Sequence, residues 1–237
     1  EVNDVLKAGD KFGSNNSAKG KKARVEFVSA NPTGPLHFGN ARGGPIGDAL
    51  ASVLEFCGYK VVREYYHNDV GEQVRKLGES IVNVAAGEKL EDQEYKGEYI
   101  LELVKKVNRI KSAQEAGEQA VELILAEIEA DCRAMGITFD KIYPESGFVS
   151  GGDTKKSLDL LERGGFLKKQ EGATWFVPHM RLGQAPNDEF LKDRETVVIK
   201  SDGSFTYFAN DIAYHNLKFS DGYDLVVDIF GANHHGH

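Results

Sequence analysis

The chain has 237 residues, of which 41% are hydrophobic and 28% are charged, and its formal net charge is −8. This composition is ordinary for a globular protein, and the length suffices for one domain with an insertion. The acidic balance argues against a general nucleic-acid binder, which is expected to be basic. The sequence contains neither an apolar run of membrane-spanning length nor a signal-peptide core, so we expect a cytoplasmic protein that does not bind membranes.

The first predicted elements form a βαβ unit. Residues 1–23 are rich in Gly, Ser, Asn and Lys and are expected to be a linker from a preceding N-terminal domain. A strand at 24–28 is followed by a helix near 40–57, with Gly58 as its C-terminal cap, and by a second strand at 60–66. Strand, helix and strand in this order predict a parallel sheet.

A long helical block is predicted next. Asp69 is expected to cap a helix, with Glu72 completing a capping box. Apolar stripes between charged faces indicate helices from about residue 76 to residue 139. We predict an insertion at about 76–180 within a domain that spans 24–237.

The last third of the chain contains two turn signals and one strongly apolar strand. Segments 166–170 and 174–178 predict a hairpin because a Glu-Gly pair lies between them, and residues 201–203 predict a second turn. Asp153 is expected to cap a helix. The apolar run at 224–230 predicts a strand at the centre of the parallel sheet.

The segment after the first strand has the features of a phosphate site. It is rich in turn-forming residues, namely Asn31, Pro32, Gly34 and Pro35. His37 and Asn40 follow, three residues apart at the predicted helix entrance, where unpaired N–H groups and the positive dipole end favour a phosphate. Gly39 between them lets a nucleotide approach the backbone.

Six blocks of sequence resemble class I aminoacyl-tRNA synthetases, and specifically the arginyl-tRNA synthetase family. His37-Phe38-Gly39-Asn40 resembles the HxGH signature of the class, with Asn40 in place of the second histidine. An amide still donates hydrogen bonds to a phosphate oxygen, but it does not titrate. The blocks occur in the family's order: VEFVSANPTGPLHFGNARG (25–43), REYYHNDVGEQV (63–74), YKGEYI (95–100), YPES (143–146), KSDGSFTYFANDIAYH (200–215) and DIFGANHHGH (228–237).

The resemblance implies a fold and a reaction. The fold would be α/β, with a Rossmann-like parallel nucleotide-binding sheet and an inserted helical and hairpin region. The reaction would be ATP-dependent activation of L-arginine and its transfer to tRNA(Arg), with Mg²⁺ accompanying the ATP and no protein-bound zinc. A monomer is expected. The family's KMSK-like lysine loop has no counterpart before His237, so the chain is interpreted as a catalytic-domain fragment of poor activity.

Arginine requires carboxylates and hydroxyls for its planar guanidinium and acceptors for its α-amino group. Tyr207 and Asp211 are four residues apart at a predicted helix entrance, hence on one face. The resemblance adds Glu145 as a second carboxylate for the guanidinium. It also implies that the amino end of the substrate lies near Ser29, Ala30, Asn31, Asn40 and His234, with Glu26 on the adjoining strand as a further candidate.

Each of these assignments has an alternative. Asp211 is also suited to cap a helix, Glu145 to be a surface carboxylate, and Glu26 to face solvent. The two cysteines are expected to be buried thiols. HHGH (234–237), with His179 and His215 elsewhere, invites a metal site but lacks further ligands at a recognisable spacing.

Two other functions and two tRNA surfaces remain open. The chain also fits an arginine-binding module without catalysis, which Asn40 permits, or another HxGH nucleotidylyltransferase that acts on a small metabolite. Any tRNA surface must be local in so acidic a chain. The candidate basic patches are Lys19, Lys21, Lys22 and Arg24, and Lys105, Lys106, Arg109 and Lys111.

Overall fold

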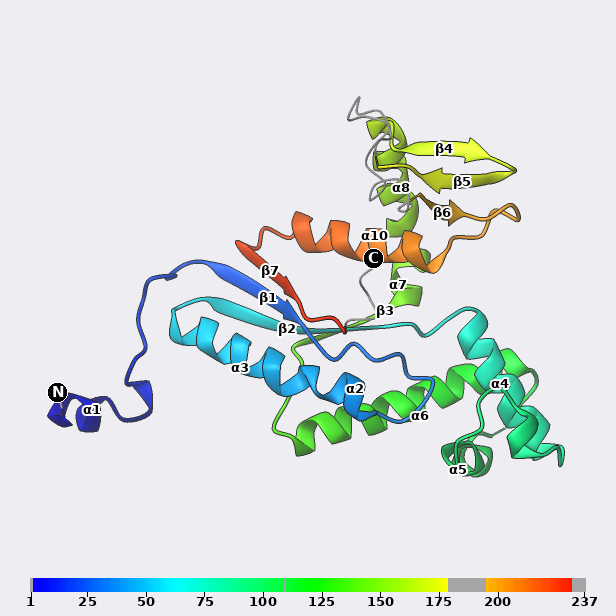
Figure 1. Ribbon diagram of the computed structural model, residues 1–237, viewed down its shortest axis with the longest axis horizontal. Coiled ribbons are helices and arrows are strands. Elements are labelled where there is room, and N and C mark those ends of the chain that lie inside the picture. Colours follow the sequence, from blue (N-terminus) through cyan, green and yellow to red (C-terminus); the bar gives the residue numbers. More distant parts are fainter. Residues whose placement is uncertain (1, 109, 179–194, 232–237) are drawn as a thin grey trace. The chain divides into compact units, whose positions relative to one another are not determined.

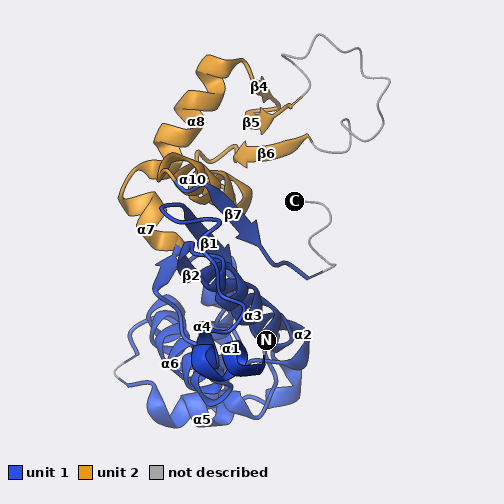
Figure 2. Cartoon of the chain, turned by 90° about the vertical axis from the view of Figure 1, so that its left-hand side faces the viewer, with its two compact units in different colours: residues 1–144, 223–232 blue, residues 145–222, 233–237 orange. Residues whose placement is uncertain are grey.

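The computed structural model describes residues 2–108, 110–178 and 195–231 (Figure 1). The chain divides into two compact units (Figure 2). Unit 1 comprises residues 1–144 and 223–232, and unit 2 comprises residues 145–222 and 233–237. Within the described residues, no helix is long and apolar enough to cross a membrane.

Unit 1 is built on a parallel sheet, which confirms the predicted α/β class. Among the described residues, four strands pair in the order β3-β2-β1-β7. They are β1 (Lys22–Glu26), β2 (Lys60–His67), β3 (Lys141–Pro144) and β7 (Leu225–Asp228), and every pairing is parallel. The prediction that the last strand is central was wrong for this part of the chain, because β7 lies at the edge. Its residues are only half buried, so an apolar run does not by itself fix a strand's place in the sheet.

Helices pack against one face of this sheet and beyond its end. Those described in unit 1 are α1 (Val2–Ala8), α2 (Phe38–Ala41), α3 (Gly43–Phe56), α4 (Glu72–Ala85), α5 (Tyr99–Lys106) and α6 (Ala113–Ala134), with 3₁₀ turns at Gly9–Lys11 and Leu90–Asp92. α3 and α6 run below the strands in Figure 1. The predicted capping box was wrong: Gly71 is the N-cap of α4, and its φ of 86° suits glycine rather than a capping aspartate.

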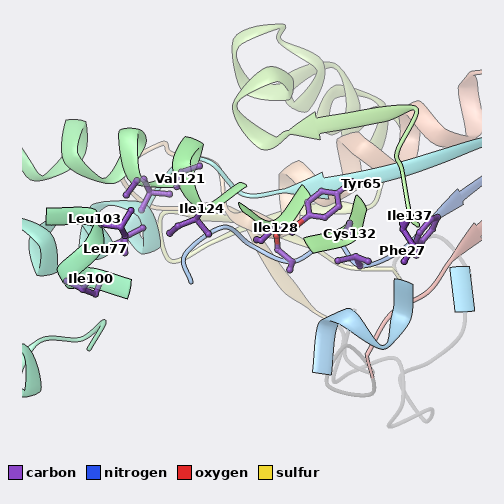
Figure 3. Close-up of a cluster of buried hydrophobic side chains, with 14 of the residues drawn as sticks. Phe27, Tyr65, Leu77, Ile100, Leu103, Val121, Ile124, Ile128, Cys132 and Ile137 are labelled. Carbon is purple, nitrogen blue, oxygen red and sulfur yellow. Dashed lines mark hydrogen bonds between the residues drawn. The ribbon is translucent and has the colours of Figure 1, made fainter. Parts of the chain in front are cut away.

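One hydrophobic cluster connects the sheet to the helices of unit 1. Figure 3 shows Tyr65 of β2 and Phe27, the residue after β1, near Cys132, and the cluster continues along α6 to α4 and α5. Cys132 is buried as expected, whereas Cys57 is only half buried, and both thiols are free. Each fully buried Leu, Ile or Phe contributes about 1.5–3 kcal/mol, so this cluster is the main support of unit 1.

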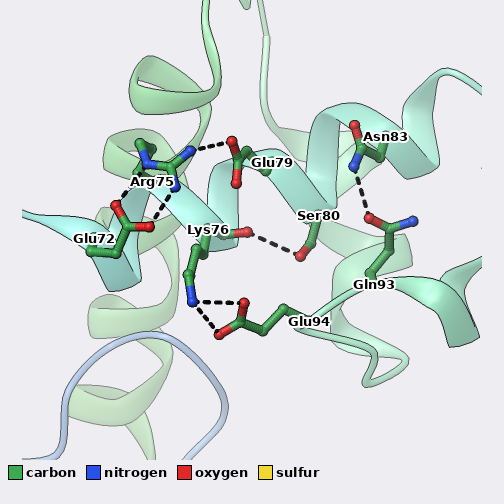
Figure 4. A network of polar contacts seen from close by, with 8 residues as sticks. All are labelled: Glu72, Arg75, Lys76, Glu79, Ser80, Asn83, Gln93 and Glu94. Carbon is green, nitrogen blue, oxygen red and sulfur yellow. Dashed lines mark hydrogen bonds and ion pairs between the residues drawn. The ribbon is translucent and has the colours of Figure 1, made fainter.

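In contrast to this apolar cluster, the exposed face of α4 carries ion pairs between charged side chains (Figure 4). Arg75 contacts both Glu72 and Glu79, and Lys76 lies 2.9 Å from a carboxylate oxygen of Glu94. Exposed ion pairs of this kind stabilise a fold only slightly. The packing of α4 therefore depends on its apolar face and on its one glycine, Gly78.

The backbones of α4 and α6 come into close contact where the two helices cross at Gly78 and Gly117. A Cβ added at Gly78 would lie 1.7 Å from the carbonyl oxygen of Ala113, and one added at Gly117 would lie 2.1 Å from the carbonyl oxygen of Val74. We expect Gly78→Ala to lower the free energy of unfolding by about 3 kcal/mol, the upper end for overpacking, because a backbone carbonyl has little room to move. Urea denaturation measures this change.

Gly43→Ala is the matched control for that substitution. Gly43 is also helical, but a Cβ there would have its nearest neighbour at 3.8 Å, an ordinary contact. We expect no loss of stability, because alanine is the better helix former. Equal stabilities of the two variants would contradict the close crossing.

Arg24 is buried, so the prediction that it belongs to the first candidate basic patch was wrong. Its side chain is fully buried, its Nε donates to Glu64 at 2.9 Å, and its guanidinium lies 4.6 Å from the ring centroid of Tyr223. Tyr143 contacts the same guanidinium, with its hydroxyl oxygen 3.2 Å away. Arg24 therefore stabilises the interior of unit 1 and is not available to bind tRNA.

A buried histidine ends β2. His67 is 4% exposed, and its Nδ1 has no hydrogen-bond partner among the described residues. Burial lowers the pKa of this imidazole from its ordinary value of 6.5, although Asp69 and Glu129 oppose the shift. Folding therefore favours the neutral ring.

The stability of the chain should depend on this histidine in mildly acidic solution. Because the folded pKa of His67 is lowered, its contribution is fully present above about pH 6.5 and is lost as the pH falls toward the folded pKa. Between pH 6.5 and 5.5 we expect the unaltered chain to lose up to about 1 kcal/mol more stability than His67→Gln. Urea denaturation at several pH values measures this difference, and identical pH slopes would contradict it.

Unit 2 packs helices against a small antiparallel sheet. Its described helices are α7 (Glu145–Ser150), α8 (Asp153–Gly164) and α10 (Tyr207–Ser220), and its described strands pair in the order β4 (Leu167–Gln170), β5 (Ala173–Phe176) and β6 (Thr196–Ile199). The predicted hairpin is confirmed as β4–β5. Glu171 and Gly172 have φ values of 54° and 78°, as a two-residue type I′ turn requires. Asp153 is the first residue of α8 rather than its cap, which is Gly152.

Candidate functional site

The chain makes a strained turn at the carboxyl edge of the parallel sheet. β1 ends at Glu26, two residues before the predicted end, because Val28 and Ser29 have φ values of 67° and 39°. The N–H of Ser29 donates to the carbonyl of Phe27 at 3.0 Å, the hydrogen-bond pattern of a γ-turn. A positive φ is rare for a β-branched residue such as Val28, and such strain persists where the surroundings enforce it. This turn is therefore a candidate for function.

The end of β2 holds this turn in place. Ser29 Oγ accepts from the N–H of Tyr66 at 3.1 Å, and Asn31 Oδ1 accepts from the N–H of Asn68 at 3.1 Å. The hydroxyl of Tyr65 donates to the carbonyl of Ala30 at 2.6 Å. The three residues of the predicted SAN turn are thus fixed together. Ser29 and Asn31 are half buried, and each side-chain oxygen keeps a second lone pair as an acceptor.

A carboxylate neighbours the turn. Glu26 is 3% exposed, which corrects the alternative that it faces solvent. In the strand register it lies beside Glu64 of β2 and Asp228 of β7. Arg24 pairs with Glu64.

The helix entrance follows the turn by a few residues. His37 is the N-cap of α2, and its carbonyl accepts from the N–H groups of Asn40 and Ala41, both at 3.0 Å. A Cβ at Gly39 would lie 3.0 Å from two atoms of the His37 ring, so the glycine makes room for the imidazole. His37 is exposed and Asn40 is half exposed. Both side chains are available to a ligand of unit 1.

Unit 2 contains the other predicted residues. Glu145 begins α7 and is 4% exposed, which excludes the alternative of a surface carboxylate. Tyr207 is the first residue of α10, as predicted, and Asp211 lies one turn later. The cap of α10 is Thr206, whose hydroxyl accepts from the N–H of Ala209 at 3.3 Å, so Asp211 does not cap this helix.

Two residues that the sequence analysis did not identify hold Glu145. Asn210 donates from Nδ2 to Glu145 Oε1 at 2.5 Å, and the hydroxyl of Thr154 donates to Asn210 Oδ1 at 2.8 Å. Asn210 lies in the interior of α10 at a buried position, where polar side chains are rare. That placement within an apolar helical stripe is the signal that could have identified it.

The metal alternative receives no support from the described residues. Among them, no group of three or more His, Cys, Asp and Glu side chains is arranged to hold a metal ion. His179 and the HHGH segment at 234–237 lie outside the described residues, and so does the predicted substrate contact His234.

Known proteins are similar to this chain over different lengths. Residues 1–95 match the family model of the class I (R) tRNA synthetase catalytic domain. An arginine–tRNA ligase of Citrifermentans bemidjiense is 39% identical over 252 aligned residues, covering 100% of this chain, and one of Anoxybacillus flavithermus is 39% identical over 98% of this chain. The chain spans 44% and 43% of these two relatives, less than half of each.

Solved structures are similar as well. A crystal structure from Campylobacter jejuni, described as an arginyl-tRNA synthetase, matches with a TM-score of 0.83 and 32% identity, covering 99% of this chain and 53% of that chain. The arginyl-tRNA synthetase structure of Thermus thermophilus matches with a TM-score of 0.62, covering 91% of this chain and 39% of that one. At 23% identity, the second match supports the fold alone.

Proposed function

We propose a function from the premise that this chain belongs to the family of class I arginyl-tRNA synthetases. The chain would carry out ATP-dependent activation of L-arginine and its transfer to tRNA(Arg), as the catalytic part of a longer enzyme. The observation that carries this proposal is the strained turn at Val28 and Ser29, held at the carboxyl edge of a parallel sheet directly before a helix entrance. Ligands of open α/β sheets bind at this edge. A cytoplasmic location is part of the same proposal, because tRNA charging serves translation.

The first step of the proposed reaction forms arginyl-adenylate. The arginine carboxylate attacks the α-phosphorus of ATP, the bond to the bridging oxygen breaks, and pyrophosphate leaves with its electron pair. His37 and Asn40 would donate hydrogen bonds to phosphate oxygens while negative charge shifts toward the leaving group. The Mg²⁺ that accompanies ATP adds positive charge there. Ser29, Asn31 and Glu26 would accept from the α-amino group of arginine, so that its carboxylate is oriented for attack.

Three further residues would select the side chain of arginine. Glu145 and Asp211 supply carboxylates and Tyr207 a hydroxyl, which match the planar donors of a guanidinium. Lysine offers a single ammonium group and cannot satisfy the same acceptors in the same geometry. The burial of Glu145 supports this role, because a desolvated carboxylate gains most from a matching cation.

The transfer step would use the adenylate made in the first step. A hydroxyl of the 3′-terminal ribose of tRNA attacks the arginyl carbonyl, and AMP leaves. We propose a local tRNA surface that includes the exposed Lys19, Lys21 and Lys22, without the buried Arg24. Of the second patch, Lys105 and Lys106 pair with Glu102 and Glu127, and Arg109 lies outside the described residues.

The decisive experiment is ATP–pyrophosphate exchange with Mg²⁺ and tRNA(Arg), run on the longer enzyme that would contain this chain, because the chain alone is expected to be poorly active. We expect exchange that depends on arginine and is absent with lysine. Arginine binding without exchange would favour the alternative of a non-catalytic arginine-binding module. Exchange that requires another small acceptor, and no tRNA, would favour a different HxGH nucleotidylyltransferase.

A further inference from the structure

We propose that Thr154 and Asn210 are positioning residues for arginine binding, because they hold the carboxylate of Glu145 in a fixed orientation. The inference rests on the proposed function, in which Glu145 binds the guanidinium. Neither residue needs to touch the substrate. Their effect would pass through Glu145.

The three residues form a directed chain of hydrogen bonds across three helices. Glu145 lies on α7, Thr154 on α8 and Asn210 on α10. Their exposures are 4%, 0% and 4%, so bulk water does not replace a lost partner. The Thr154 hydroxyl is 2.8 Å from Asn210 Oδ1, and Asn210 Nδ2 is 2.5 Å from Glu145 Oε1.

The chemistry of the amide gives this chain its direction. An asparagine amide has an acceptor end and a donor end, and a carboxylate accepts only from the donor end. The hydroxyl of Thr154 binds the acceptor end, so it keeps the donor end turned toward Glu145. Without that hydroxyl, the amide keeps its contact with the carboxylate, but its oxygen loses its donor in a buried site. A shift of the amide toward another donor would move Glu145 with it.

The position of Asn210 on α10 strengthens the inference. It lies between Tyr207 and Asp211, so one turn of the helix carries two proposed guanidinium ligands and the residue that holds the third. A small error in the orientation of Glu145 would therefore change its placement relative to the other two. Binding geometries of this kind tolerate only small displacements.

A second polar pair between the same helices provides a matched control. Asn216 of α10 donates to Ser157 Oγ of α8 at 3.2 Å, and Ser157 is also buried. Within the described residues, Ser157 and Asn216 form no hydrogen bond with Glu145. If the only role of these hydrogen bonds is to stabilise the packing of α8 against α10, then removing the hydroxyl of Thr154 or that of Ser157 should have the same effect on ligand binding.

Calorimetric titration with L-arginine and, separately, with ATP tests the proposal on the unaltered chain, Thr154→Val, Thr154→Ser and Ser157→Ala. We expect Thr154→Val to weaken arginine binding about tenfold, because it leaves a buried amide without its donor. ATP binding should not change. Thr154→Ser keeps the hydroxyl and should restore arginine affinity to within about twofold, and Ser157→Ala should match the unaltered chain.

The outcomes separate this inference from the proposed function. Failure of the unaltered chain to bind arginine would contradict the proposed function and this inference with it. Normal arginine binding by Thr154→Val would overturn the inference alone. Equal losses in Thr154→Val and Ser157→Ala, or a parallel loss of ATP binding, would also overturn it, because they indicate a general packing effect.

Discussion

Arginine binding should weaken by about 2–5 kcal/mol when Asp211 or Glu145 is replaced by alanine, because each change removes one partner of a desolvated charge pair. For Glu145→Ala the loss also includes the Asn210 amide, which would lose its acceptor in a buried site. Calorimetry with L-arginine measures the affinities. Lysine should bind none of these proteins detectably, because its ammonium cannot form the paired contacts of a guanidinium.

Two further variants make this experiment specific. Glu145→Gln keeps the size of the side chain and an oxygen for Asn210 but removes the charge. A loss of arginine affinity in this variant would therefore indicate electrostatic recognition rather than packing. Glu162→Ala removes an exposed carboxylate from α8 of the same unit and should bind arginine normally. Unchanged arginine affinity in Asp211→Ala and Glu145→Ala would reject both residues as guanidinium ligands.

His37→Ala should slow arginine-dependent ATP–pyrophosphate exchange by about 10²–10³-fold, or about 2.7–4 kcal/mol, as is typical when one donor to a developing oxyanion is lost. His37 is exposed and caps only the short helix α2, and no side-chain hydrogen bond is part of that cap. The variant should therefore unfold at the same temperature as the unaltered chain. Exchange at the normal rate would show that the turn is structural only.

Asn40→His tests the departure from the HxGH signature. If Asn40 contacts phosphate by hydrogen bonding alone, placing an imidazole there in the full-length enzyme should change exchange by less than about tenfold near pH 7.5, or about 1.4 kcal/mol. Exchange assays across pH 6–9 measure whether a new titration appears. A gain well above tenfold would instead show that a charged group is needed at this position.

The sequence by itself determined the elements whose signals are local. The βαβ unit, the β4–β5 hairpin and the placement of Tyr207 at the start of α10 all follow from patterns within a few residues. The Glu-Gly turn and the helical spacing of apolar residues need no distant partner to be recognised. The resemblance to arginyl-tRNA synthetases also rested on contiguous blocks, so the family could be identified from the sequence alone.

Only the tertiary structure decided which polar residues are interior. Arg24 looked like a surface cation until Glu64, 40 positions later, was found to pair with it. The strain at Val28 depends on hydrogen bonds from the end of β2, and Asn210 acquires its proposed role through Thr154, 56 positions away. Such partners are joined by folding and leave no pattern at short spacing, because burial and hydrogen bonding depend on which segments pack together rather than on neighbouring residues.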